Sequence, residues 1–444
     1  MFILRDLLTA LQTPFSTPSL GRERAHWFVF TRLAVIVPLT SSRTSNVLRS
    51  LRTWFGLDLS QRRFYTFRAS SKLPWERLWR VLWSLIPAPR VAGRLLVVWD
   101  DSIHNKTGRG IFGGGFFHDP TAQLNQPTYP GSQSVLVIGL LKRVKGRWSC
   151  LPLAFRFYFM KKDPQAKAPT AQQDGRTVPF QSKMTQAVPM LTAVARHFIG
   201  LPVLGVADSG FGNEGLLRPL RLSALAFDLL SRLRSHIPLY DRPPERTPSQ
   251  RGRGRQYGTR LGSVSDPAVL DRPLARVLPV FLDGTVRQVQ AYDPVWVLKH
   301  LRCRVRVVWV FRKSRWGALF TTDRTLSVEQ IIEYYGARWT IEAGFREIKQ
   351  AIGSAKSQVR NAHSAINHLN FCMMATTLPW IYADRIQADP QRRHVVKGRT
   401  RLAFSDGRHL IAHAALSEDF LRLWPAPPES PKTLFLSLLL RRVA

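Results

Sequence analysis

The sequence predicts an α/β protein with a mixed sheet flanked by helices, and three patterns support this prediction. Residues 95–101 (LLVVWDD) and 201–207 (LPVLGVA) are short, continuous apolar runs, as in strands that are buried on both faces. Two longer runs, SVLVIGLLKR and WSCLPLAFRFYF, are separated by the turn residues KGR and indicate paired strands. Residues 75–86 and 327–352 carry apolar side chains at helical spacing.

Residues 1–90 are expected to be helical and basic. Pro74 opens a helix with apolar positions at helical spacing, and the PAP segment at 87–89 ends it. Just upstream, SQRRFYTFRASSK alternates aromatic side chains with Arg62, Arg63, Arg68 and Lys72. This pattern favours a small helical DNA-binding domain, and the alternative is a helical subdomain with a solvated basic rim.

Residues 91–234 are expected to supply most strands of the core. The glycine-rich segment TGRGIFGGGFFHDP lacks the Gly-Lys-Ser/Thr ending of a phosphate-binding loop, so a mobile loop without a nucleotide cradle is predicted. The run LPVLGVADSGFGN predicts a buried strand that ends in Asp208 and is followed by glycines and a helix. ALAFDLLSRLRS predicts a further strand.

Residues 235–326 interrupt this pattern and are expected to form a β-rich insertion. A basic Pro/Gly-rich stretch with Arg251, Arg253, Arg255 and Arg260 precedes the strand-like runs VRQVQAYDPVWVL and VRVVWVFRKSRWGALFTT. Ser327 and Gln330 have capping-box spacing and Gly353 follows the last apolar position, so one helix is predicted between them. AINHLNFCMMATTLPWIYAD predicts a core helix, and residues 385–444 form a basic, Pro-punctuated tail without a predicted role.

The composition points to a nucleic-acid partner. The 65 Lys and Arg residues against 29 Asp and Glu give a net charge of +36, which neutralisation of phosphates explains better than solubility does. The alternatives are a generally basic proteome or a protein of the membrane surface. No apolar run is long enough to span a bilayer, no signal peptide is evident, and Cys150, Cys303 and Cys372 are too scattered for a disulfide framework or a zinc site. A reducing, cytoplasmic location is therefore expected.

The segment YYGARWTIEAGFREIKQ holds the most informative polar cluster. Tyr335, Arg338, Glu342 and Lys349 fall within about 60° of one another on a helix, with Arg346 beside them. An apolar stripe lies next to this cluster and consists of Tyr334, Ile341, Phe345, Ile348 and Ile352. Ion pairs on a solvated helix are the alternative explanation.

Three carboxylates together predict a site for divalent cations. Asp101 ends the first buried strand, Asp208 ends a later one, and Glu342 lies on the helix after the insertion. Oxygen ligands favour Mg²⁺, or Mn²⁺, and two such ions can activate water and stabilise a leaving oxygen at a phosphodiester. Asp100 and Asp101 are adjacent and point to opposite faces of a strand, so this reasoning does not choose between them.

At these residues the chain resembles the DDE transposases of bacterial insertion sequences, in the subgroup with a tyrosine–arginine–glutamate–lysine signature. YYGARWTIEAGFREIK carries the signature, WDDS favours Asp101 as the first acid although Ser102 replaces the commoner threonine, and VADSGFGN gives Asp208. The resemblance covers roughly residues 90–380. It implies a ribonuclease-H-like catalytic core in residues 91–234 and 327–384, with the insertion at 235–326 before the last catalytic helix.

The resemblance also implies a function. Asp101, Asp208 and Glu342 would bind Mg²⁺, water attack would free a 3′-hydroxyl at a transposon end, and this hydroxyl would then attack target DNA. Double-stranded DNA would be contacted in a homodimeric synaptic complex at the bacterial nucleoid by Tyr335, Arg338, Arg346 and Lys349. One tryptophan, Trp309 or Trp316, would stack on an extruded base; the alternative is that these tryptophans belong to the core. The alternatives are an inactive or repurposed DNA-binding protein and a nuclease without strand transfer.

Overall fold

The computed structural model describes most of the chain. The described residues are 2–16, 21–108, 110–120, 122–162, 170–173, 176–223, 225–244, 255–282, 284–299, 301–313, 315–387 and 401–423. Arg251 and Arg253 of the basic stretch, and the parts of the predicted tail at 388–400 and 424–444, lie outside these residues.

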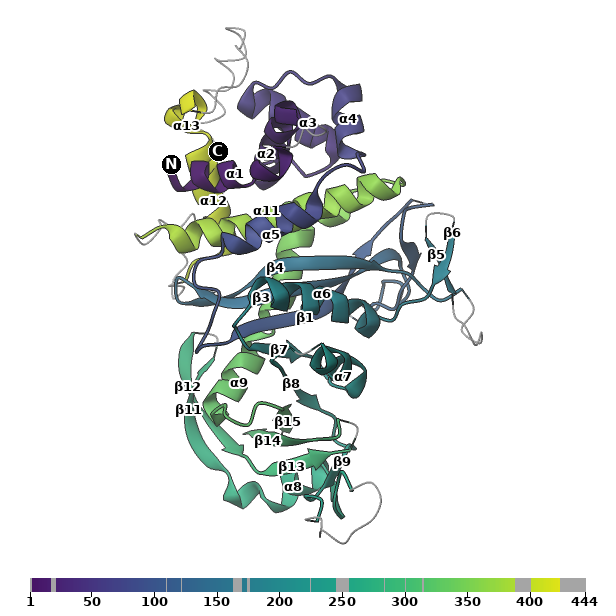
Figure 1. Ribbon diagram of the computed structural model, residues 1–444, viewed down its shortest axis with the longest axis vertical. Helices are drawn as coiled ribbons and strands as arrows, with labels where there is room; N and C mark the ends of the chain where they lie inside the picture. Colours follow the sequence, from purple (N-terminus) through teal and green to yellow (C-terminus); the bar gives the residue numbers. More distant parts are fainter. Residues whose placement is uncertain are drawn as a thin grey trace.

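The N-terminal region is helical, and its first helices lie at one end of the molecule, at the top of Figure 1. They are α1 (Phe2–Ala10), η1 (Thr13–Phe15), α2 (Gly21–Ile36), α3 (Thr44–Phe55), α4 (Gln61–Arg68) and α5 (Trp75–Ser84). Pro74 precedes α5, as the sequence indicated, and the apolar positions Leu78, Trp79 and Leu82 of this helix are buried. The apolar period of the sequence therefore sets the buried face of α5.

A large, mostly antiparallel sheet crosses the molecule. Its first part consists of β1 (Leu95–Asn105), β2 (Gly114–Phe116), β3 (Gly131–Val144), β4 (Arg147–Tyr158), β7 (Val203–Ala207) and β8 (Phe227–Leu233). The strand order is β4-β3-β1-β7-β8, in which β1, β7 and β8 are parallel and β3 and β4 are antiparallel to their neighbours. A separate hairpin, β5 (Thr170–Gln173) and β6 (Arg176–Pro179), projects to one side (Figure 1).

The region expected to be a β-rich insertion extends the same sheet beyond β8. It contains β9 (Pro238–Tyr240), β10 (Arg260–Ser263), α8 (Ser265–Leu270), η2 (Arg272–Leu274), β11 (Arg276–Leu282), β12 (Thr285–Tyr292), β13 (Val295–Leu298), β14 (Cys303–Arg312) and β15 (Arg315–Thr321). β15 pairs with β8 in antiparallel fashion, so the strands of this region are continuous with the sheet of β1, β7 and β8.

Helices cover both faces of the core strands. α6 (Lys183–His197) and α7 (Glu214–Leu222) contact each other on one face, with α6 on β3 and β4 and α7 on β8. The other face carries α9 (Val328–Ala337), α10 (Thr340–Arg346), η3 (Glu347–Ile352), η4 (Ser354–Lys356) and the long α11 (Ala362–Arg385). α12 (Phe404–Ala415) and α13 (Glu418–Leu423) follow in the region that the sequence left without a predicted structure.

α11 joins the N-terminal helices to the sheet and is buried along most of its length (Figure 1). Trp75 Nε1 donates to Asn367 Oδ1 at 2.6 Å, and Trp79 Nε1 donates to Asn370 Oδ1 at 2.8 Å. Asn367 Nδ2 also donates to the carbonyl oxygens of Arg68 and Ser70, both at 2.9 Å. These bonds satisfy polar groups at an otherwise apolar contact, so they fix how the helical region sits on α11. Within the described residues, no helix is both long and apolar enough to cross a bilayer.

Candidate active site

One open cavity of about 710 Å³ collects acidic and basic side chains from five separate parts of the chain. Asp100 comes from β1, Asp208 directly follows β7, and Tyr335, Arg338 and Glu342 come from α9, α10 and the turn between them. β8 and the β14–β15 hairpin add Arg232, Arg312, Arg315 and Trp316 to the lining, and Trp339 lines it from the turn between α9 and α10.

The strand register explains why Asp100 meets Asp208. β1 and β7 are parallel, and their last aligned pair is Val98 with Val206. Asp100 and Asp208 each follow this pair by two residues, so they lie at the same level of the sheet. Because side chains two residues apart on a strand share a face, both point to the side that α9 and α10 cover.

Asp101 lies on the opposite face. Its carboxylate accepts a hydrogen bond of 2.6 Å from Lys183 Nζ at the start of α6. The structure therefore does not bring Asp101 together with Asp208 and Glu342, and the geometry favours Asp100 as their partner. The physical reason is the alternation of side chains along a strand, which moves neighbouring residues to opposite faces.

Arg338 lies between two of the carboxylates. Its side chain is buried, with Nη1 at 3.6 Å from Asp100 Oδ2 and Nη2 at 3.3 Å from Glu342 Oε1. The guanidinium also lies over the rings of Tyr335 and Trp339, with centroid distances of 5.6 and 4.9 Å. Arg338 thus offsets the repulsion between the two acids, and it presents little surface to a phosphate in this arrangement.

Burial perturbs the acid and phenol groups of the cavity. It raises the pKa of Asp100 to about 6, and the charges of Asp101 and Glu342 act in the same direction, whereas the Asp101 amide and Arg338 oppose it. Burial also raises the pKa of Tyr335, and the charge of Asp208 adds to this effect. Asp100 therefore carries a negative charge that its surroundings only partly compensate, as at a site prepared for a cation.

The other predicted DNA-binding side chains of this helical segment lie outside the cavity lining. Arg346 is exposed on α10, one turn beyond Glu342. Lys349 lies on η3 and is partly buried, with Nζ at 3.5 Å from the carbonyl oxygen of Ile103. Burial lowers the pKa of Lys349, and Asp119 opposes this effect. The expected apolar stripe of Tyr334, Ile341, Phe345, Ile348 and Ile352 is buried.

The helix expected between Ser327 and Gly353 is present in pieces. Ser327 Oγ accepts from the Gln330 amide at 3.1 Å and Gln330 Oε1 accepts from the Ser327 amide at 3.0 Å, which confirms the predicted capping box. Gly353 ends the segment with a φ of 86°, a left-handed conformation that favours glycine. Between these ends, a turn at Arg338 and Trp339 separates α9 from α10, and η3 is a π-helix.

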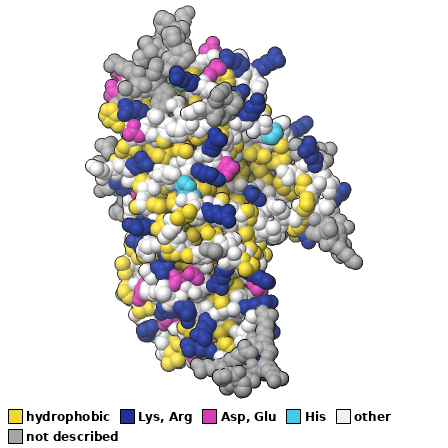
Figure 2. All heavy atoms as spheres, viewed as in Figure 1, with side chains coloured by type: hydrophobic (Ala, Val, Ile, Leu, Met, Phe, Trp, Pro, Cys, Tyr) yellow, Lys and Arg dark blue, Asp and Glu magenta, His cyan; other side chains and the backbone are white. Residues whose placement is uncertain are grey.

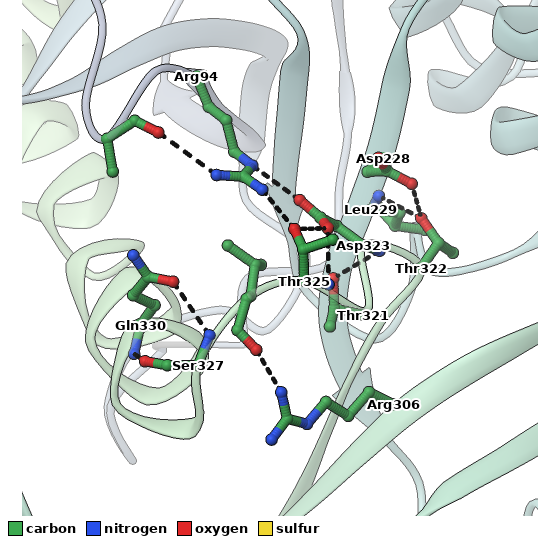
Figure 3. A network of polar contacts seen from close by, with 12 residues as sticks. Arg94, Asp228, Leu229, Arg306, Thr321, Thr322, Asp323, Thr325, Ser327 and Gln330 are labelled. Atoms are coloured by element: carbon green, nitrogen blue, oxygen red, sulfur yellow. Dashed lines mark hydrogen bonds and ion pairs between the residues drawn. The ribbon is translucent and has the colours of Figure 1, made fainter.

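A polar network fixes the start of α9 against the sheet (Figure 3). Arg94, just before β1, donates to Asp323 Oδ2 at 2.7 Å and to Thr325 Oγ1 at 2.6 Å. Thr322 donates to Asp228 Oδ1 of β8 at 2.6 Å, and Arg306 of β14 donates to the Leu326 carbonyl. Although burial opposes it, hydrogen bonds from Thr325 and Arg94 lower the pKa of Asp323. The network joins β8, β14 and the residue before β1 to the start of α9, the helix that precedes Glu342 in the chain.

Sequence reasoning missed several basic residues of the cavity. Arg232, Arg312 and Arg315 line it and are exposed, and the last two flank the turn of the β14–β15 hairpin. The cluster of charges in FRKSRW was a signal for this turn, but the fold was needed to direct it toward the acids. Trp316 also lines the cavity, whereas Trp309 is fully buried and donates to the Val264 carbonyl at 2.9 Å, as a core residue does.

The donor set of the cavity suits a hard divalent cation, but it is not a preassembled cage. Among the described residues, no three His, Cys, Asp or Glu side chains are close enough to hold a metal ion as they stand. Asp100, Asp208 and Glu342 nevertheless supply carboxylate oxygens around one cavity, and burial, with a smaller contribution from neighbouring acids, raises the pKa of Asp100 there.

Two comparisons with known proteins found similarities for this chain. Residues 181–378 match the family model described as the transposase DDE domain, a range that includes Asp208, Glu342 and the whole insertion. The match covers less than half of the chain and supports similarity to a DDE transposase domain over that range. No curated protein matches the chain. Among solved structures, a piggyBac transposase in a synaptic complex with hairpin DNA is similar over 99% of this chain and 82% of that chain, with 11% identity and a TM-score of 0.42.

Proposed function

We propose that this protein is a DNA transposase that cleaves DNA at the ends of an insertion sequence and joins the freed 3′-hydroxyl to target DNA. The observation that supports the proposal most directly is the convergence of Asp100, Asp208 and Glu342 on one cavity with a basic rim. The net charge of +36 supports DNA as the substrate, since its phosphates would offset the excess of cations. Figure 2 shows Lys and Arg side chains spread over the visible face, with few acidic ones among them.

In this proposal, Asp100 replaces Asp101 as the first metal ligand, and Asp208 and Glu342 complete the set. Mg²⁺ or Mn²⁺ bound there would activate the attacking oxygen and stabilise the leaving oxygen of a phosphodiester. Arg338 would orient Asp100 and Glu342, while Tyr335 and the exposed Arg312 and Arg315 would hold the backbone of the reacting strand. Arg346 and Lys349 would contact DNA beyond the cavity, and Trp316 is the tryptophan placed to meet a base at this rim.

The remaining expectations belong to the same proposal. The order β4-β3-β1-β7-β8, with β1, β7 and β8 parallel, is consistent with a ribonuclease-H-like core in residues 91–234 and 327–384, and the strands of 235–326 with the insertion. Residues 1–90 would bind the transposon end, and two copies of the chain would pair in the synaptic complex. DNA binding by residues 1–90 and pairing of two copies would both take place on DNA at the bacterial nucleoid.

The proposal is tested by a cleavage assay on DNA taken from both flanks of the gene, with and without Mg²⁺. Asp208→Asn and Glu342→Gln should abolish cleavage and joining and should leave DNA binding intact. Glu329→Gln, which removes a partly buried acid outside the cavity lining from the first turn of α9, serves as the matched control and should cleave as the wild type does.

The assay also separates the alternatives. A wild-type chain that binds this DNA and never cleaves it would point to a repurposed DNA-binding protein. Cleavage without joined products would leave a nuclease that lacks strand transfer. Normal cleavage by both the Asp208→Asn and the Glu342→Gln variants would refute the assigned site.

A further inference from the structure

The glycine-rich segment after β1 forms one wall of a second, basic cavity that the proposed active site does not use. This cavity, here called the glycine pocket, has a volume of about 410 Å³. Its wall includes Gly113 and Gly114 from the segment, Phe159 and the exposed Lys161 and Lys162 beyond β4, and the exposed Arg360 before α11. The described lining contains three cations and no acidic side chain.

Contacts of the described residues hold the loop in place, where the sequence suggested a mobile segment. The carbonyl oxygen of Phe112 accepts from Gln133 Nε2 at 2.6 Å, and the Gly114 amide donates to the Ile111 carbonyl at 2.9 Å. Lys106 Nζ donates to the carbonyl oxygens of Ala355 and Ser357, which connects the start of the loop to the segment after the catalytic helix.

Two glycines are required by this path. Gly113 has a φ of 69°, which strains any residue with a side chain, and a Cβ at Gly114 would lie 2.9 Å from the Ile111 carbonyl oxygen. The backbone can therefore form a wall close to the cations only with glycine at these positions. A wall of this kind admits a phosphate near the backbone, which bulky side chains would prevent.

The cations of the glycine pocket are available for an anion. Among the described residues, none of Lys161, Lys162 and Arg360 forms an ion pair with a carboxylate. Lys161 Nζ lies over the Phe180 ring at 5.2 Å from its centroid. Arg360 also directly precedes the N-terminus of α11, whose dipole favours negative charge nearby. The chemistry of the pocket thus fits a phosphate group, with Phe159 offering an apolar surface to an attached sugar or base.

The strand register places the glycine pocket relative to the carboxylates. Gly114 pairs with Gln133 and Gln133 with His104, so Gly114 lies level with a residue four positions beyond Asp100 on β1. Four residues along the strand and two strands across correspond to about 16 Å. At about 3.4 Å for each nucleotide of a strand, this distance spans about five nucleotides.

We propose that the glycine pocket binds a backbone phosphate of the DNA about five nucleotides from the phosphodiester that is cleaved. This inference rests on the proposed function, because it takes DNA as the ligand of both cavities. Lys161, Lys162 and Arg360 neutralise the phosphate, and the loop at Gly113 and Gly114 allows it to approach the backbone. The pocket then fixes how far along the duplex the carboxylates act.

The test measures binding of a fluorescent duplex from the flank of the gene as a function of salt concentration. The variant Lys161→Gln/Lys162→Gln/Arg360→Gln should reduce the slope of log affinity against log salt by about 0.9, the value for one lost phosphate contact. The charge-retaining variant Lys161→Arg/Lys162→Arg/Arg360→Lys should keep the wild-type slope and so controls for folding. Arg196→Gln, an exposed cation on α6, is the matched control for loss of charge.

A second measurement locates the contact. Single phosphates of the duplex are replaced by neutral methylphosphonates, and one replacement about five nucleotides from the cut should weaken binding of the wild type but not of the triple Gln variant. The glycine pocket would be overturned as a DNA contact if each methylphosphonate weakened binding of the wild type and of the triple Gln variant equally. An unchanged salt slope for the triple Gln variant would overturn it as well. Glu342→Gln should bind with the wild-type slope without cleaving, so failure of the pocket and failure of the proposed chemistry give different results.

Discussion

Asp100→Asn should abolish activity and raise stability, whereas Asp101→Asn should largely keep activity and lower stability, although the two residues are neighbours. Burial raises the pKa of Asp100 from 3.8 to about 6. At about 1.36 kcal/mol for each pKa unit, the ionised carboxylate destabilises the metal-free fold by up to about 3 kcal/mol above pH 6. Asp100→Asn removes this cost, so the free energy of unfolding at pH 8 without metal should rise by about 1–3 kcal/mol.

The sign of this effect fixes its pH dependence. A carboxyl group with a raised pKa in the folded state contributes full stability below its unfolded pKa and loses it as the pH rises through the folded value. The advantage of Asp100→Asn should therefore be absent below pH 3.8, grow up to about pH 6 and stay constant above it. Asp101→Asn weakens the bond to Lys183, so it should lower stability by about 1 kcal/mol or less, as for a partly exposed pair.

The cleavage assay supplies the second half of this prediction. Asp100→Asn should reduce Mg²⁺-dependent cleavage by about a thousandfold or more, since a lost metal ligand costs several kcal/mol in the transition state. Asp101→Asn should retain cleavage within about tenfold, which is about 1.4 kcal/mol. Urea unfolding and cleavage are measured on the same preparations. Cleavage that survives in Asp100→Asn and disappears in Asp101→Asn would refute the assignment from strand register.

Three further predictions concern burial, docking and DNA contact. Burial raises the pKa of Glu347 to about 7, so Glu347→Gln should stabilise the protein by about 2–3 kcal/mol at pH 8 and change little at pH 4, as measured by denaturant unfolding at both pH values. Asn367→Ala removes three hydrogen bonds between α11 and the helical region and should cost about 3 kcal/mol, whereas the exposed His363→Ala on the same helix should cost little; equal losses would contradict the docking role. Arg312→Gln combined with Arg315→Gln should lower the salt slope of DNA binding by about two, and the buried Arg338→Gln should leave it nearly unchanged.

Local features of the fold follow from the sequence because short-range physics controls them. The capping box at Ser327 and Gln330 is present, and Gly353 ends its segment in a left-handed conformation, because both depend on a few neighbouring residues. The apolar runs at 95–99 and 203–207 form the buried strands β1 and β7. α12 was not predicted in the basic tail, and the helix after Ser327 is divided at Arg338 and Trp339, since tertiary contacts override local preference there.

The sequence by itself determined which types of side chain are present for the proposed chemistry, namely strand-end aspartates, a glutamate in a basic helix and a large excess of cations. Only the tertiary structure decided which of these side chains meet. Asp100 joins Asp208 because β1 and β7 align at Val98 and Val206, a register that no local pattern encodes. The same holds for Arg312 of the hairpin and Arg360 of the glycine pocket, which reach their cavities through contacts between segments far apart in the chain.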